Sequence, residues 1–73
     1  MITVELSGGP ADGWKGPQID FRVVLPIPPQ FGASEGCYRV RRGMTGRPIA
    51  RYAPSDPQPA LLYDYQPPER LGA

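Results

Sequence analysis

The sequence has no histidine and only one cysteine, Cys37. Without histidine, the chain lacks the ordinary base that activates a serine or cysteine nucleophile near neutral pH. One thiol cannot close a disulfide within the chain, and without imidazoles it cannot complete a tetrahedral zinc site. We therefore predict a non-enzymatic protein with no catalytic residue, no metal and no cofactor, in which Cys37 is buried apolar filler.

Long uninterrupted segments are also missing. No apolar run approaches the roughly 18 residues of a membrane-spanning helix, and no basic segment followed by an apolar one marks a signal peptide. No segment free of both proline and glycine exceeds eight residues, whereas an average helix has about 11. The sequence thus predicts an all-β fold with little helix and no membrane partner.

Turn-forming residues are abundant, with eleven prolines and nine glycines in 73 residues. Proline restricts φ and pushes the preceding residue towards extended geometry. We predict one small β domain over residues 1–73, with stiff Pro-rich loops and an extended C-terminal tail from about residue 66. A core this small supplies only about 3–5 kcal/mol. We therefore expect the fold to gain order from a partner, either another protein or a second copy of the chain.

Alternating segments predict four or five short strands, in a small antiparallel sheet or partial barrel. The segment "ITVEL" places Ile2, Val4 and Leu6 on one face, and "DFRVVL" does the same with Phe21, Val23 and Leu25. The further candidates are "CYRVRR", "PIARYA" and "ALLYDYQ"; the last puts Leu61, Tyr63 and Tyr65 on one side. A short turn of helix around "PALLYDY" is the alternative for that last segment.

The segment "SGGPADG" directly follows the first of these strands. It does not match a phosphate-binding loop, because no Lys-Ser/Thr pair closes it and no helix can follow through "WKGPQ". Proline, aspartate and glycine in this order are typical of a β-turn. We therefore interpret the segment as the turn that reverses the first strand.

Acidic residues are absent between Tyr38 and Tyr52, where five arginines lie instead. If "YRVRR-GMTG-RPIARY" forms a hairpin with Val40 opposite Ala50, then Arg39 lies opposite Arg51. Like charges in that position are unfavourable, so either an acidic partner compensates them or the register differs. Three interpretations of these arginines remain open. They form a solvated strand face, they bind an acidic protein partner or, less favoured, they bind nucleic acid. The candidate partner-binding residues are Arg39, Arg41, Arg42, Arg47, Arg51, Trp14 and Phe31, of which the last two could instead cap the core.

The opening "MITVELSGGPADG" resembles short proteins of actinobacteria and their phages that begin with a strand and a G-G-P-x-D-G turn. The later segments "FRVVLPIPP" and "YRVRRG…RYAP" fit the layout of that group loosely. The resemblance implies a virion or accessory protein, so we expect a minor capsid, decoration or cement protein that binds a major capsid or other virion protein. Its location would be the virion, assembled in the host cytoplasm, or otherwise the cytoplasm. The alternative is a small basic module that binds nucleic acid or a host protein.

Overall fold

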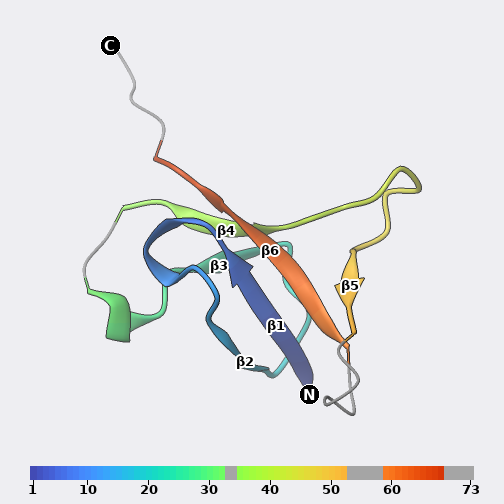
Figure 1. Ribbon diagram of the computed structural model, residues 1–73, viewed down its shortest axis with the longest axis horizontal. Helices are drawn as coiled ribbons and strands as arrows, with labels where there is room; N and C mark the ends of the chain where they lie inside the picture. Colours follow the sequence, from blue (N-terminus) through green and yellow to red (C-terminus); the bar gives the residue numbers. More distant parts are fainter. Residues whose placement is uncertain (33–34, 53–58, 69–73) are drawn as a thin grey trace.

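A computed structural model describes residues 1–32, 35–52 and 59–68 (Figure 1). Within these ranges the chain forms six strands and two short 3-10 turns, and no α-helix. The elements are β1 (Ile2–Ser7), η1 (Gly9–Ala11), β2 (Lys15–Gln18), β3 (Val24–Pro26), η2 (Pro29–Phe31), β4 (Cys37–Val40), β5 (Ala50–Arg51) and β6 (Ala60–Gln66). The predicted all-β fold is confirmed. Residues 53–58 and most of the predicted C-terminal tail, 69–73, lie outside the described residues.

The strands form one curled, open sheet in the order β2-β1-β6-β4-β3, and β5 also pairs with β6. The sheet closes only halfway into a barrel, with β2 and β3 as its free edges (Figure 1). The β1–β6 pair is parallel, whereas the other pairs are antiparallel. The predicted partial barrel is therefore confirmed, whereas antiparallel pairing was wrong for β1 and β6, because β6 returns beside β1 after the rest of the chain has crossed over.

Strand β6 lies at the centre because its sequence allows pairing on both sides. It contains neither proline nor glycine, so every residue can donate a backbone hydrogen bond. The edge strands β2 and β3 contain Pro17 and Pro26. Proline cannot donate to a ladder and is found at sheet edges. The segment "KGPQ" of β2 was not among the predicted strands for the same reason.

The core fills the concave side of the half-barrel. Its buried members come from β1, the β1–β2 loop, β3, β4 and β6: Val4, Leu6, Ala11, Leu25, Tyr38, Val40 and Tyr63. The alternation predicted for β1 and β6 is confirmed, since Val4 pairs with Leu61 and Leu6 with Tyr63 on this face. The prediction that Phe21 faces inward was wrong. Phe21 is 42% exposed, because β3 begins only at Val24.

Three tyrosines of the concave face bind the backbones of three different loops. The Tyr38 hydroxyl donates to the Gly8 carbonyl at 2.6 Å and accepts from the Ala11 N–H at 2.9 Å. The Tyr63 hydroxyl donates to the carbonyl of Arg22, and the Tyr65 hydroxyl donates to that of Glu35 at 2.9 Å. The sheet thereby holds loops that form few ladder bonds of their own.

The "SGGPADG" segment is the connection between antiparallel β1 and β2, as predicted. The Gly8 N–H donates to Asp12 Oδ1 at 2.7 Å, and the Leu6 carbonyl accepts from the Gly13 N–H. Gly9 has φ +64°, and a Cβ at this position would lie 2.4 Å from the ring of Tyr65. The glycine-rich sequence is thus required because the loop packs directly on the tyrosines of the core.

Candidate functional site

Most of the arginines predicted to bind a partner lie on or beside a hairpin between β4 and β5. Its base has the predicted register, because Arg42 bridges Pro48 and the Ile49 N–H donates to the Arg41 carbonyl at 2.8 Å. Beyond that base the two arms separate, and both pair with β6. Tyr38 consequently pairs with Tyr65 and not with Tyr52.

Arg39 and Arg51 therefore do not lie opposite each other, and the alternative that these strands pair differently holds. Arg39 lies opposite Asp64 on β6, whereas Arg51 pairs with Ala60. The side chain of Arg51 instead forms an ion pair with Glu5 at 2.9 Å. The repulsion expected from the sequence disappears because acids distant along the chain reach this convex face.

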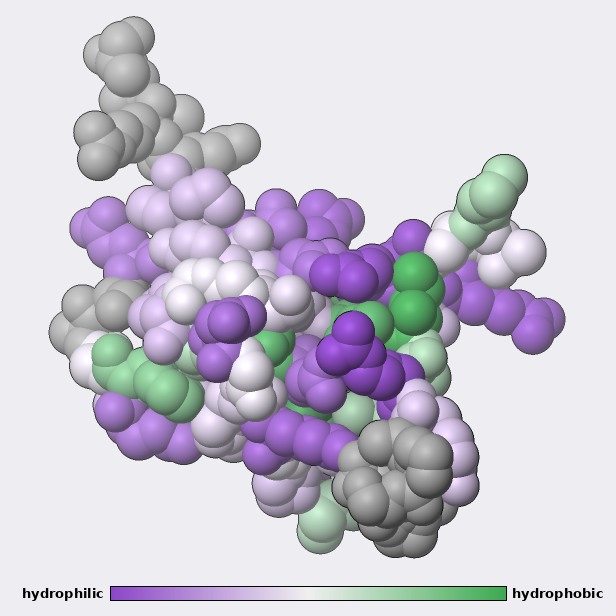
Figure 2. Space-filling model, in the orientation of Figure 1, coloured by the Kyte–Doolittle hydropathy of each residue, from purple (hydrophilic) through white to green (hydrophobic). Residues whose placement is uncertain are grey.

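Arg41 and Asp64 form a second ion pair on the convex face. Arg41 Nε donates to Asp64 Oδ2 at 2.8 Å, and its Nη2 donates to Oδ1, so the contact is bidentate. These bonds lower the pKa of the Asp64 carboxyl and raise that of the Arg41 guanidinium. Much of the positive charge of the convex face is thus paired with acids of the same chain. Figure 2, in the orientation of Figure 1, shows strongly hydrophilic residues beside hydrophobic ones on this surface.

The hairpin tip "GMTG" projects away from the body of the molecule (Figure 1). The Gly46 N–H donates to the Gly43 carbonyl at 2.9 Å, and the Gly43 N–H donates to that of Arg47 at 3.0 Å. The guanidinium of Arg42 donates to the Gly46 carbonyl across the turn. Met44 is fully exposed at this tip. The turn thus presents an apolar side chain on an internally hydrogen-bonded support.

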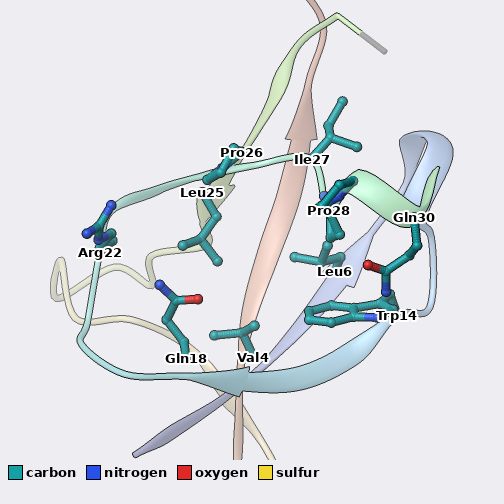
Figure 3. A pocket seen from close by; sticks show the side chains of 11 residues that line it. Val4, Leu6, Trp14, Gln18, Arg22, Leu25, Pro26, Ile27, Pro28 and Gln30 are labelled. Atoms are coloured by element: carbon teal, nitrogen blue, oxygen red, sulfur yellow. The ribbon is translucent and has the colours of Figure 1, made fainter. Parts of the chain in front are cut away.

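A groove opens on the other side of the molecule, where the half-barrel fails to close (Figure 3). It has a volume of about 380 Å³, which is within the range of small-ligand and side-chain pockets. Val4 and Leu6 of β1 form its floor, and Leu25 of β3 points into it (Figure 3). The remaining lining residues are Trp14, Gln18, Arg22, Pro26, Ile27, Pro28, Pro29 and Gln30.

The indole of Trp14 forms one wall of the groove and lies across the backbone of β2. A Cβ at Gly16 would approach the indole to 2.4 Å, so only glycine leaves room for the ring there. A second hollow of about 330 Å³ adjoins the groove and shares Gln18 and Arg22 with it. Asp20 also lines this second hollow. The second hollow is formed by the end of β2 and the residues that follow it.

The two aromatic candidates lie near this opening rather than near the arginines. Trp14 is half-buried in the groove wall, and half-buried Phe31 of η2 packs against the core. The sequence did not single out Gln18, Arg22, Gln30 or Met44. Only Met44 carried a usable signal, since a large apolar residue between two turn glycines has nothing to pack against. The groove arises from the curl of the sheet, which no local pattern encodes.

No cluster of three or more potential metal ligands occurs among residues 1–32, 35–52 and 59–68. Cys37 is half-buried and opposite Gln66, so its predicted burial as core filler was wrong. No helix in the described part of the chain is long and apolar enough to cross a membrane. Comparisons with protein-family models, curated proteins and solved structures found no match.

Proposed function

We propose that the chain is a non-enzymatic docking protein that attaches to a larger protein assembly, specifically as a minor capsid, decoration or cement protein of a phage virion. The observation that carries the docking role is the projecting hairpin with Met44 at its tip. The virion setting rests on the resemblance of the opening thirteen residues.

The hairpin has the properties of an insertion element. Its turn is closed by backbone hydrogen bonds and by Arg42, so little conformational entropy remains to be lost on binding. A methionine side chain is flexible and polarizable, and it fits apolar pockets of irregular shape. Exposed Arg42 and Arg47 bracket it along the chain. A partner with an apolar pocket surrounded by carboxylates would match this tip.

A nucleic-acid module has less support from the arrangement of charge. Arg41 and Arg51 are paired with Asp64 and Glu5, and the whole chain carries a formal charge of only +1. Binding to a phosphate backbone depends on several basic groups that are free to displace counterions. The internal pairing therefore favours a protein partner over nucleic acid.

The docking proposal is tested by sedimenting particles from a lysate of the phage that encodes the chain and measuring its ratio to the major capsid protein. We expect a constant ratio across the particle fractions of a density gradient. A chain that remains entirely in the soluble fractions would refute the virion assignment. Submicromolar DNA binding by the pure protein, lost with added salt, would instead support the nucleic-acid module.

The role of the hairpin is tested with Met44→Ser against the control Thr45→Ser in the same turn. We expect Met44→Ser to lower particle occupancy about tenfold, since a buried apolar anchor contributes about 1–3 kcal/mol. The control should retain full occupancy, and both variants should melt like the wild type. Equal occupancy of both variants would remove the hairpin from the interface.

A further inference from the structure

We infer that the concave groove binds an extended peptide segment carrying an acidic side chain. This inference rests on the proposed docking function. It adds to the hairpin a second contact with the partner, on the concave side of the sheet. Three features carry it: an apolar wall, and two carboxamides and one guanidinium that have no partner in the described part of the chain.

The apolar wall is preformed. The backbone of Trp14 is held in place, because its amide N–H donates to the Ala11 carbonyl at 3.0 Å and its carbonyl accepts from the Leu6 amide N–H at 2.8 Å. The indole packs directly against Gly16, and Leu25 and Pro28 line the groove on the side away from β2 (Figure 3). An aromatic ring facing proline and branched aliphatic side chains is a surface suited to an apolar side chain of an extended segment.

The two carboxamides match the polar groups of a peptide backbone. Gln18 and Gln30 both line the groove (Figure 3), and neither side chain has a hydrogen-bond partner among the described residues. Each carboxamide offers one acceptor and two donors, the complement of a peptide C=O and N–H. The edge strands supply fewer backbone donors, because Pro17 and Pro26 have no N–H. Side chains are therefore the principal polar contacts for an inserted segment.

Arg22 supplies the charge. Its carbonyl is held by the Tyr63 hydroxyl, so its backbone position is determined by the core. Within the described residues its guanidinium has no ion pair, unlike Arg41 and Arg51. Among the described residues it is the only charged one that lines the groove. A carboxylate is the group that a free guanidinium binds most specifically, often through two parallel hydrogen bonds.

The test is a selection of linear peptides from a random yeast-displayed library on the 73-residue chain. Wild type, Arg22→Gln and the control Arg47→Gln, which changes an exposed arginine on the hairpin, serve as baits. We expect peptides that join an acidic residue to apolar neighbours. The acidic preference should disappear with Arg22→Gln and persist with Arg47→Gln. No enrichment on the wild type, or the same acidic preference on all three baits, would overturn the inference.

The selected peptide is then titrated while the emission of Trp14, the only tryptophan of the chain, is recorded. We expect a saturable change in emission, and about tenfold weaker binding for Arg22→Gln or for a peptide with Gln in place of Glu. Binding that leaves the emission of Trp14 unchanged, or that depends on Arg47, would place the contact outside the groove. If Arg22→Gln protein binds no peptide yet retains full particle occupancy, the docking function stands without the groove. The same conclusion follows if Met44→Ser lowers particle occupancy and Arg22→Gln does not.

Discussion

Replacing Tyr38 with phenylalanine tests whether tyrosine hydroxyls hold the loops on the half-barrel. Tyr38 and Ala11 are both fully buried. The substitution leaves the Ala11 N–H without its acceptor, and a buried donor without a partner costs about 1–3 kcal/mol. The Gly8 carbonyl belongs to an exposed residue and can accept from water instead. We therefore expect a loss of about 2 kcal/mol in the free energy of unfolding.

A loss of this size is large for so small a domain. With a total stability of about 3–5 kcal/mol, it should lower the melting temperature by roughly 10 °C. Urea unfolding followed through Trp14 emission measures it directly, because Trp14 binds the same loop through its N–H bond to Ala11. Tyr52→Phe is the matched control, since Tyr52 is largely exposed. Removing its hydroxyl should change the free energy of unfolding by less than about 0.5 kcal/mol. A Tyr38→Phe protein as stable as this control would refute the reasoning.

Three further predictions concern the groove wall and the ionisable pairs. Gly16→Ala should displace the indole of Trp14 and shift the tryptophan emission. The control Gly43→Ala should not, because a Cβ there would meet nothing closer than 3.8 Å. Identical emission spectra of the two variants would contradict the packing of Trp14 on Gly16. Because Arg41 lowers the pKa of Asp64, the pair stabilises the fold above the unfolded pKa of about 4. The stability lost in Asp64→Asn, measured by urea unfolding, should therefore vanish as pH falls through the folded pKa, and a pH-independent difference would count against the pair. Burial raises the pKa of Tyr63, so the wild type should lose stability above about pH 10, and Tyr63→Phe should lose less over the same range.

The half-barrel gives a physical reason for the large share of proline and glycine. Loops rich in these residues form few ladder bonds, and their backbone groups need partners elsewhere. Tyr38, Tyr63 and Tyr65 supply such partners from the sheet. Two of these rings also contact each other, with centroids of Tyr38 and Tyr65 5.5 Å apart. The tyrosines of β4 and β6 thus act as core residues and as loop anchors at once.

Local patterns were sufficient to predict the strand class and much of the core. In "ITVEL" and "ALLYDYQ" the alternation of apolar residues determined which side chains face inward, because successive residues of a strand point to opposite faces. The turn at "SGGPADG" was predictable because glycine and proline restrict the backbone locally. The base of the hairpin was predictable for the same reason, since "GMTG" sets the register from Arg42 and Pro48 inward.

Tertiary structure alone decided which strands pair and what the surface presents. Strand β2 escaped prediction because Gly16 and Pro17 are tolerated only where one side of the strand is unpaired. The partner of Arg41 is Asp64, far along the chain, and no local pattern encodes such a contact. The parallel β1–β6 pair and the open groove likewise depend on how the whole sheet curls. The parallel pair and the groove follow from long-range packing of the core side chains on the concave side, which is a property of the assembled sheet rather than of any single segment.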